Sequence, residues 1–270
     1  MEYHLPFAMR TATNAGSLLM KNWGKTKLLS VVKAGEKGLI TEADSASDEF
    51  IRYEIRRAYP DHSIVSEEGY PVKGSEFEWV VDPLDGTNNY SRGDPHFSVS
   101  IALKYRGESV VGVIHNPAFG EFGDLYYAEK GSGAFVRRNG ETSRLHVSGP
   151  ESRRMSTFSF ATGVHFHEPE MFEKIFEKIR GAKLFDHMRG RMLESTAYEL
   201  CCVADGRFDA HFNNVAEPWD VAAGDVIVRE AGGMVTHFAP RSGRKNVMLA
   251  SNGVVHGELV KIVREIIEDR

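Results

Sequence analysis

The spacing of hydrophobic residues predicts an N-terminal half in which two helices precede a long run of strands. Apolar residues at helical spacing predict helices over 5–23 and 45–59. Short apolar runs predict strands over 28–32 and 61–69. From 97 to 148, apolar and polar residues alternate between regularly spaced turns, which is typical of an antiparallel meander. The first half is therefore expected to be an α+β unit.

Beyond residue 152 the pattern changes, and predicted strands alternate with predicted helices. The expected strands lie near 156–160, 208–212, 234–236 and 247–250, and the expected helices at 169–180, 193–204, 219–231 and from 255 onward. Such alternation favours an α/β unit. The turn-forming stretch 148–152 is the expected boundary between an N-terminal domain of residues 1–148 and a C-terminal domain of residues 149–270.

Composition and charge narrow the classes of function. The 270 residues are 41% hydrophobic and 26% charged, which is enough to bury a full core. A net charge of -5 argues against a nucleic-acid partner held by phosphate contacts, since such a protein needs a basic face. The adjacent Cys201 and Cys202 form no disulfide framework and suit a reducing compartment. With no secretory signal and no apolar run near the ~18–20 residues of a membrane span, we expect a cytoplasmic protein without a membrane partner.

The stretch 79–89 carries the first candidate chemistry. Its three leading apolar residues indicate the end of a buried strand, and Pro83 and Gly86 predict a sharp turn, because proline lacks a backbone donor and glycine tolerates unusual conformations. Asp82 and Asp85 lie on that turn. Two carboxylates at the end of an apolar strand cost free energy unless a cation neutralises them. The pattern therefore predicts a divalent-metal site.

Four further residues extend this candidate site. Gly86 and Thr87 are suited to point backbone N–H groups at an anion, so a phosphate is the expected ligand. Glu67 ends the predicted strand before a glycine, Asp44 lies near a helix start, and Asp220 opens another helix. Each of these acids alone has an ordinary explanation, as a solvated turn or as a complement to a helix dipole. Together with the stretch above they form a specific combination.

That combination resembles the inositol monophosphatase family, the lithium-sensitive, magnesium-dependent sugar phosphatases. The matching motifs are Asp-Pro-Leu-Asp-Gly-Thr at 82–87, the upstream Glu67 and Trp-Asp-x-Ala-Ala-Gly at 219–224. The resemblance runs from the element at 41–44 to the turn at 230–233. The family includes archaeal enzymes that act on fructose 1,6-bisphosphate. The resemblance implies a layered αβαβα sandwich, with the active site at the junction of the two halves.

The resemblance also implies the metal ligands. Glu67, Asp82 and the carbonyl of Leu84 look like the ligands of a first Mg²⁺, and Asp82, Asp85 and Asp220 like the ligands of a second. Glu67 is similar to the residue that holds a third ion through water. Two or three Mg²⁺ ions per site are expected, with Mn²⁺ as an alternative. Carboxylate and carbonyl oxygens suit such hard cations, and no Cys/His cluster with zinc spacing competes.

The same resemblance assigns the reacting groups. Asp44 and Thr87 resemble the pair that orients the attacking water. Glu67 is also expected to be catalytic, because it holds an ion. The backbone N–H groups of Gly86 and Thr87, with Asn88 next to them, are expected to bind the phosphate end of the substrate. Two metals ~3.5–4 Å apart can activate the water and stabilise the leaving oxygen. The expected reaction is direct displacement without a phospho-enzyme.

The residues expected to choose the substrate depart from the family pattern. Asn213 stands where inositol-type enzymes carry a glutamate, and it offers a donor as well as an acceptor and no charge. Ala197 is a predicted substrate neighbour. Arg189 and Arg191 have two interpretations: they reach a second phosphate, which favours a bisphosphate substrate, or they pair with Glu194 and a partner subunit.

The expected activity is Mg²⁺-dependent hydrolysis of small sugar or polyol phosphates, with inositol monophosphate as the first substrate and fructose 1,6-bisphosphate as the second. Within the same class, 3′-phosphoadenosine phosphatase and histidinol phosphatase are the alternatives. A role of another class is that of a non-catalytic partner of a transcription complex, since some bacterial members of the family assist such complexes. The resemblance further implies a homodimer.

Overall fold

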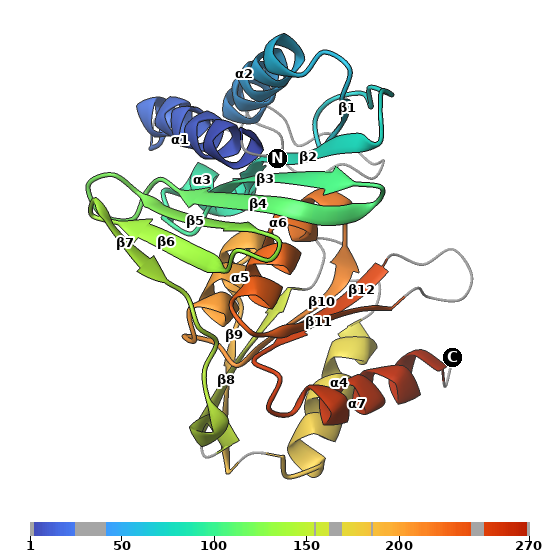
Figure 1. Cartoon of the computed structure of the whole chain (residues 1–270). Helices are drawn as coiled ribbons and strands as arrows, with labels where there is room; N and C mark the ends of the chain where they lie inside the picture. Colours follow the sequence, from blue (N-terminus) through green and yellow to red (C-terminus); the bar gives the residue numbers. More distant parts are fainter. Residues whose placement is uncertain are drawn as a thin grey trace.

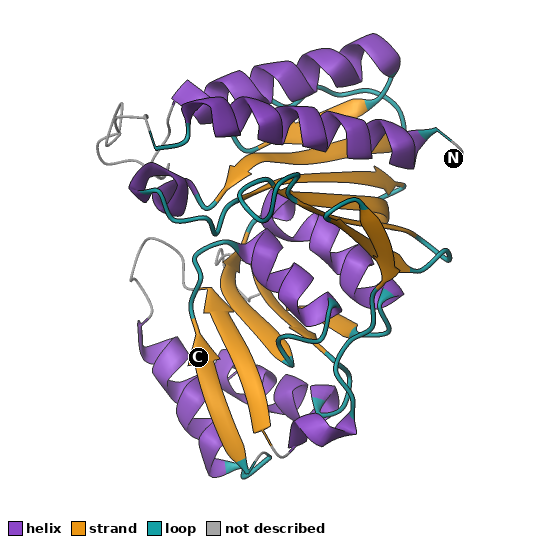
Figure 2. Cartoon of the chain, turned by 90° about the vertical axis from the view of Figure 1, so that its left-hand side faces the viewer, coloured by secondary structure: helices purple, strands orange, loops and turns teal. Residues whose placement is uncertain are grey.

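The structure is a computed structural model, and it describes residues 3–24, 42–153, 155–161, 169–184, 186–238 and 246–268. The strand predicted over 28–32 lies outside the described residues. Within them the chain forms two β-sheets and three layers of helices, as Figure 1 shows. Figure 2 gives the side view, in which helices and sheets alternate from one end of the molecule to the other. The predicted αβαβα sandwich is therefore confirmed.

The first sheet has seven strands that follow one another in chain order. They are β1 (Ser63–Ser66), β2 (Phe77–Asp85), β3 (Ser98–Tyr105), β4 (Glu108–Asn116), β5 (Asp124–Glu129), β6 (Ala134–Arg138) and β7 (Glu141–Arg144). β1 runs parallel to β2, and every later neighbour is antiparallel. The meander predicted over 97–148 is confirmed by β3 to β7.

The second sheet has five strands in the order β11-β12-β10-β8-β9. They are β8 (Met155–Ala161), β9 (His187–Arg191), β10 (Ala210–Ala216), β11 (Met234–Phe238) and β12 (Asn246–Ser251). A short 3-10 helix at Pro150–Arg153 precedes β8. The edge strand β9 was not predicted, because its sequence His-Met-Arg-Gly-Arg lacks the apolar alternation on which strand prediction depends.

Seven α-helices complete the described chain. They are α1 (His4–Asn22), α2 (Glu42–Ala58), α3 (Thr87–Arg92), α4 (Pro169–Gly181), α5 (Thr196–Ala204), α6 (Pro218–Glu230) and α7 (His256–Glu268). Apart from the short α3, each matches a predicted helix. α1 and α2 cover one face of the first sheet, α5 and α6 lie between the sheets, and α4 and α7 cover the outer face of the second sheet (Figure 1).

Three hydrophobic clusters fill the spaces between these layers. One lies between α1, α2 and the first sheet, one surrounds α5 and α6, and one lies under α4 and α7. The central layer packs closely: a Cβ added to Gly112 of β4 would lie 2.4 Å from the carbonyl oxygen of Ala223 in α6. Since the central cluster draws residues from both sheets, the division into domains at 148–152 stays a prediction.

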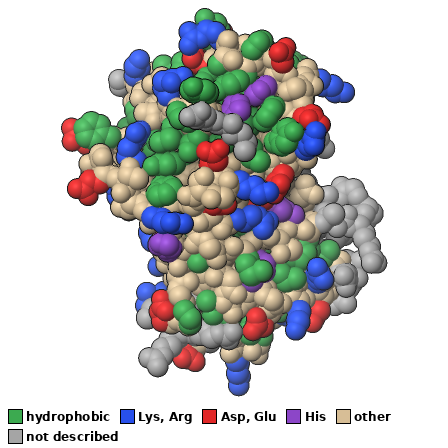
Figure 3. Space-filling view, viewed as in Figure 1, with side chains coloured by type: hydrophobic (Ala, Val, Ile, Leu, Met, Phe, Trp, Pro, Cys, Tyr) green, Lys and Arg blue, Asp and Glu red, His purple; other side chains and the backbone are tan. Residues whose placement is uncertain are grey.

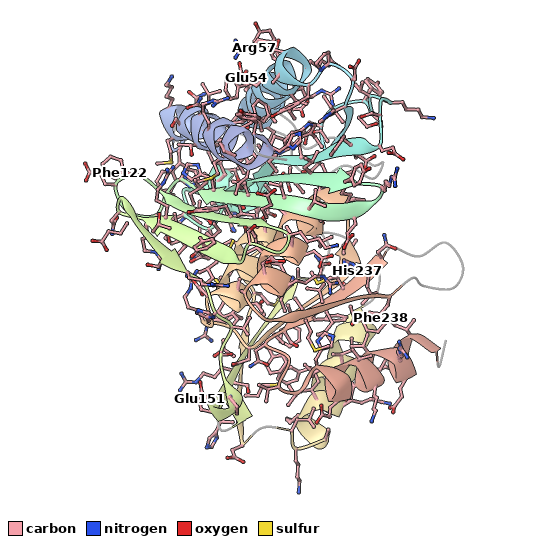
Figure 4. The ribbon with its side chains drawn as sticks, viewed as in Figure 1. Glu54, Arg57, Phe122, Glu151, His237 and Phe238 are labelled. Atoms are coloured by element: carbon pink, nitrogen blue, oxygen red, sulfur yellow. The ribbon has the colours of Figure 1, made fainter. Side chains whose placement is uncertain are left out.

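Strand alternation is visible at the end of the second sheet. On β11, His237 turns to α6 and contacts the Asp225 carboxylate at 2.9 Å, whereas the adjacent Phe238 is buried in the outer cluster (Figure 4). Successive side chains of this strand therefore pack in different layers.

Farther away, Glu54 and Arg57 form an ion pair of 2.7 Å at the outer end of α2 (Figure 4).

The surface has no strongly basic face in the view of Figure 3. Lys and Arg side chains are interspersed there with Asp and Glu side chains. None of the helices that the structure describes is both long and apolar enough to cross a bilayer.

Pro83 does not end its strand, so the sharp turn predicted at this residue is wrong. β2 continues to Asp85, and the chain turns at Gly86. The register against β3 shifts between Asp82 and Asp85, which pair with Ser100 and Ser98. Two steps along β3 thus oppose three along β2, and this bulge accommodates the residue that lacks an N–H group.

Candidate active site

Five acidic residues predicted from the sequence lie where α2, β1, β2 and α6 meet. Asp44 is in the first turn of α2, Glu67 follows β1 directly, Asp82 and Asp85 are on the last part of β2, and Asp220 is in the first turn of α6. Burial raises the pKa values of Glu67 and Asp82 most, and the negative charge of Asp220 raises both further. The structure therefore brings the predicted acids together.

The parallel pairing of β1 and β2 places Glu67 beside Asp82. Ser66 is in register with Val81, and the N–H of Glu67 donates to the carbonyl of Val81 at 3.2 Å. Because parallel strands end at the same edge of a sheet, both acids emerge there together. The side chains of Glu67 and Asp82 also share a hydrogen bond.

α2 is fastened to both strands next to these acids. The hydroxyl of Ser47 donates to the carbonyl of Pro83 at 2.9 Å, and the hydroxyl of Ser66 donates to the carboxylate of Asp48. Asp44 lies one turn before Asp48 and is 1% exposed. These two hydrogen bonds fix the start of the helix, so the Asp44 carboxylate is held against the end of β2.

Asp85 is held by residues from distant parts of the chain. Its Oδ2 accepts hydrogen bonds from the Ser195 hydroxyl at 2.5 Å, from the Ala197 N–H at 2.9 Å and from the Ser98 hydroxyl at 3.3 Å. Ser195 is the N-cap of α5 but makes no side-chain cap bond to its own helix. The Asp85 carboxylate caps the helix instead, because it accepts a hydrogen bond from an N–H group that has no partner within the helix.

Asp220 is fixed by its own helix and by the first sheet. Its side chain and that of Glu217 form a capping box, in which the N–H of Glu217 donates to Asp220 at 3.0 Å. The hydroxyl of Ser100 donates to the carbonyl of Trp219 at 3.3 Å. Ser100 is the register partner of Asp82, so this bond ties the start of α6 to the strand position beside Asp82.

Burial and mutual repulsion make these carboxylates hard to ionise. Burial is the main cause that raises the pKa of Glu67 to about 8, followed by the negative charges of Asp220 and Glu68. Burial also raises the pKa of Asp82, again aided by neighbouring acids. The pKa of Asp85 is raised by burial, although the hydrogen bonds from Ser195 and Ala197 oppose the shift. Such a group needs either protons or a cation.

The acids lie near one another, but their side chains are not arranged as a metal coordination shell. Among the described residues, no three acid, histidine or cysteine side chains converge on one point as metal ligands would. Asp82 accepts the N–H of Leu84 at 3.0 Å, while Asp85 and Asp220 face helix starts. The donor set nevertheless consists of oxygen atoms, which is the chemistry that Mg²⁺ requires.

Thr87 joins the acid cluster to the turn after β2. Its Oγ1 lies 2.9 Å from a carboxylate oxygen of Asp44 and 3.1 Å from the carbonyl oxygen of Leu84. The preceding Gly86 has φ +87°, and a Cβ there would lie 2.8 Å from the carbonyl oxygen of His96. Only glycine fits this turn. Gly86 and Thr87 therefore lie beside the acids, and binding of a phosphate by their N–H groups stays a prediction.

The other predicted substrate residues have other partners in the structure. The Asn88 amide donates to Glu194 at 2.7 Å, and the Arg191 guanidinium donates to the carbonyl of Gly190 at 2.9 Å. The side chain of Ala197 is buried in the central cluster. Asn213 donates to Thr196 at 3.0 Å and is 3% exposed. Contact of these residues with a substrate stays a prediction.

Sequence reasoning missed residues that hold the site in place. Asn89 donates to the carbonyls of His96 at 2.7 Å and Leu193 at 2.6 Å, and Glu199 accepts the N–H of Leu193 at 3.0 Å. Ser195 could have been found as a helix N-cap. The other contacts carry no sequence signal, because they join side chains to backbone groups of loops at separations of 6 to 104 residues that no motif specifies.

A separate hollow of about 380 Å³ lies over α1 and β6. Its lining residues are Pro6, Met9, Arg10, Thr13, Asn14 and Arg137. None of the predicted site residues takes part in it. The acid cluster at the end of β2 is therefore the candidate active site on chemical grounds, not because of its volume.

A five-layer sandwich with buried acids beside a glycine turn defines a class of enzyme, the phosphoric monoester hydrolases of this fold. The chain belongs to the inositol monophosphatase family, whose model matches residues 1–268. A fructose-1,6-bisphosphatase/inositol-1-monophosphatase from Thermotoga maritima is 39% identical over 268 residues, which cover 98% of this chain and 97% of the relative.

Two further comparisons agree with the family. A protein from Haemophilus influenzae named Nus factor SuhB is 37% identical over 265 residues, covering 96% of this chain and 95% of its own. The solved structure of an IMPase from Thermotoga maritima matches with a TM-score of 0.81 and 37% identity, over 100% of this chain and 99% of the other. The resemblance predicted from the motifs is confirmed.

Proposed function

We propose that this protein is a Mg²⁺-dependent phosphatase for small sugar or polyol phosphate monoesters, with inositol 1-phosphate as its first substrate and fructose 1,6-bisphosphate as its second. One observation carries the proposal: Glu67, Asp82, Asp85 and Asp220 lie close together, and burial raises the pKa values of the first three. This arrangement is costly in a folded protein unless cations bind there. The names of the relatives agree with it.

The donor set fits Mg²⁺. In the proposed site Glu67, Asp82 and the carbonyl of Leu84 would hold one ion, and Asp82, Asp85 and Asp220 would hold another. All of these donors are oxygens, and Mg²⁺ needs only a few carboxylates because it keeps several waters. Bound Mg²⁺ would supply a hydroxide at neutral pH and neutralise charge on the leaving oxygen.

The chain's own groups then orient the reaction. The Thr87 hydroxyl donates to the buried Asp44 carboxylate at 2.9 Å, which leaves its oxygen lone pairs to accept a hydrogen bond from the attacking water. A water fixed in this way is aligned for in-line attack on phosphorus. The backbone N–H groups of Gly86 and Thr87, at the start of α3, hold the phosphate oxygens.

The proposal is tested by replacing single acids and measuring both metal binding and turnover. Asp82→Asn and Asp220→Asn should each reduce Mg²⁺-dependent phosphate release by about 10³-fold or more, since a lost metal ligand removes several kcal/mol of transition-state stabilisation. Both variants should also lose the rise in melting temperature that Mg²⁺ produces in the wild type. Asp61→Asn, an exposed acid before β1, is the matched control and should behave as the wild type.

A panel of phosphate esters assayed with and without Li⁺ would rank the substrates. Inositol 1-phosphate, fructose 1,6-bisphosphate, 3′-phosphoadenosine 5′-phosphate and histidinol phosphate cover the alternatives, and we expect Li⁺ to inhibit. Full activity of Asp82→Asn or Asp220→Asn would overturn the assignment of the site.

A second candidate function comes from the relatives named Nus factor SuhB, of which one is 37% identical over 96% of this chain. As a partner of a transcription complex, the protein would co-purify with RNA polymerase or ribosomal RNA. That role should survive Asp82→Asn, whereas the phosphatase should not. We also propose a cytoplasmic homodimer, which light scattering of the purified protein would check.

A further inference from the structure

One residue beside the acid cluster adopts a backbone conformation that its side chain disfavours. Among the described residues, Arg106, Asn139, Lys183 and Glu194 are the non-glycine residues with left-handed φ. Glu194, with φ +56°, directly precedes Ser195, whose hydroxyl binds Asp85. Such a conformation is strained and is kept where the surroundings impose it.

Hydrogen bonds hold the residues on both sides of Glu194 in place. Asn89 and Glu199 hold the backbone of Leu193, just before it, and Asp85 holds Ser195, just after it. The carboxylate of Glu194 itself accepts the Asn88 amide at 2.7 Å. Glu194 is thus fixed on both sides while its side chain stays exposed at the rim.

The partner of Glu194 is itself oriented. Arg92 donates through Nε to Oδ1 of Asn88 at 3.0 Å, so the Asn88 Nδ2 group must face Glu194. This contact uses Oε2 of Glu194, and no hydrogen bond from a described residue reaches Oε1. The result is an exposed carboxylate next to Ser195, with Oε2 bonded to Asn88 and Oε1 open to a ligand.

We propose that Glu194 is a specificity-determining residue, which accepts a hydroxyl hydrogen bond from a polyol monophosphate and repels a substrate with a second phosphate. The inference rests on the proposed function, because it assigns the alcohol part of that substrate. An ionised carboxylate accepts hydrogen bonds and donates none, so it matches hydroxyl groups. Its charge is unfavourable toward a further dianion bound at the same rim.

Glu194 differs in its surroundings from Asn213, for which a substrate contact stays a prediction. Asn213, the predicted hydroxyl contact, is 3% exposed and uses its amide for Thr196 and its Oδ1 for the N–H of Val215. Glu194 has the exposure and the free lone pairs that this role needs. Arg191 on β9 is the competing element, since its guanidinium would favour a second phosphate instead.

The test compares three esters with Mg²⁺ in the wild type and Glu194→Gln. Inositol 1-phosphate carries hydroxyls and one phosphate, fructose 1,6-bisphosphate carries a second phosphate, and p-nitrophenyl phosphate carries no hydroxyl. Glu194→Gln should lower kcat/KM for inositol 1-phosphate roughly tenfold, mainly through KM, because a charged acceptor is lost. It should raise kcat/KM for fructose 1,6-bisphosphate at least about threefold. The value for p-nitrophenyl phosphate should change less than about twofold.

Two further variants make the result specific. Glu194→Asp keeps the charge and should stay closer to the wild type on fructose 1,6-bisphosphate than Glu194→Gln does. Glu141→Gln removes the same charge from exposed β7 and should leave all three values unchanged. Unaltered melting temperatures would show that the variants fold.

The outcomes separate this inference from the function on which it rests. Equal loss on all three esters would assign Glu194 a structural role and overturn the inference, as would unchanged ratios or a fall on fructose 1,6-bisphosphate. In each of these cases the phosphatase itself stands. If the wild type hydrolyses none of the three esters, the proposed function and the inference fail together.

Discussion

Two turns meet beside the acid cluster, and each places one residue in the left-handed region. At the end of β2 it is Gly86, with φ +87°, and before α5 it is Glu194, with φ +56°. Both lie next to a residue that contacts the site: Gly86 follows Asp85 and Glu194 precedes Ser195. The two turns are therefore alike in backbone conformation and in position.

They differ in what the conformation requires. Gly86 has no alternative, since a Cβ would lie 2.8 Å from the backbone oxygen of His96, which is also held by a hydrogen bond from Asn89. Glu194 carries a long side chain in a conformation where glycine would be free of strain. The first turn thus requires glycine, whereas the second keeps a side chain that its backbone conformation does not require. Retained strain at an exposed residue points to use of that side chain.

The largest expected effect comes from breaking the first turn. Gly86→Ala combines an unfavourable φ with a clash, so it should lower the free energy of unfolding by about 2–4 kcal/mol. Because a misplacement of about 1 Å can cost 10²-fold, activity should fall at least about that far. Chemical denaturation and a phosphatase assay measure the two losses.

Gly93 provides the matched control at the other end of α3. It has φ +76° but no atom within 4 Å of an added Cβ, so Gly93→Ala should cost only about 1 kcal/mol and leave activity nearly intact. Equal losses in both variants would show that the backbone angle, and not the contact with His96, limits the turn.

A smaller effect is expected at the contact between the two turns. Ser195→Ala removes the donor at 2.5 Å from Asp85, whereas Ser98→Ala removes one at 3.3 Å. Losing a hydrogen bond to a charged group costs about 1.5–3 kcal/mol, so the Mg²⁺ concentration for half-maximal activity should rise about tenfold in Ser195→Ala. The change should be clearly smaller in Ser98→Ala. A reversed order would mean that the longer contact is the one that holds Asp85.

The pH dependence of stability probes the acids that both turns surround. The folded pKa of Glu67 is raised to about 8 from an ordinary 4.5, so between these values the folded state holds a proton that the unfolded state has lost. Without Mg²⁺, stability should therefore fall as pH rises through this window, on the order of 2 kcal/mol between about pH 5 and pH 8.

Added Mg²⁺ should reverse that loss, because it binds the ionised acids. The rise in melting temperature on adding Mg²⁺ should be several degrees larger at about pH 8 than at about pH 5. Glu67→Gln removes one of the protons concerned and should weaken the metal-free dependence, the rest of which comes from Asp82 and Asp85. An equal or larger effect of Mg²⁺ at the lower pH would contradict this account.

How far the sequence predicts the site follows from the same contrast. Asp82, Asp85 and Gly86 lie close together in the chain, so a sequence motif reveals their chemistry. Hydrophobic periodicity predicts most helices and strands of the sandwich. The strand β9 was missed because it lacks apolar alternation, and Pro83 was misjudged because a bulge accommodates it. Such outcomes depend on neighbours that a local pattern does not contain.

The contacts of the second turn illustrate the same limit. The bond between Asn88 and Glu194 joins residues 106 positions apart, and that between Asp85 and Ser195 joins residues 110 apart. No spacing rule links such pairs. Asn213 was assigned to the substrate by position alone, and only the structure shows that its amide is used within the protein.

The smallest expected effect is that of Glu194→Gly on stability. The substitution relieves left-handed strain of about 1–3 kcal/mol. Against this, the entropy of a glycine and the loss of an exposed bond to Asn88 together cost about 1–2 kcal/mol. The free energy of unfolding should therefore change by less than about 1 kcal/mol, in contrast with Gly86→Ala. Chemical denaturation of both variants gives the comparison directly. A loss above about 2 kcal/mol would show that Glu194 is needed to build the second turn. A small change would show that the second turn does not require the Glu194 side chain, so its carboxylate is available for the substrate. The first turn, in contrast, requires Gly86.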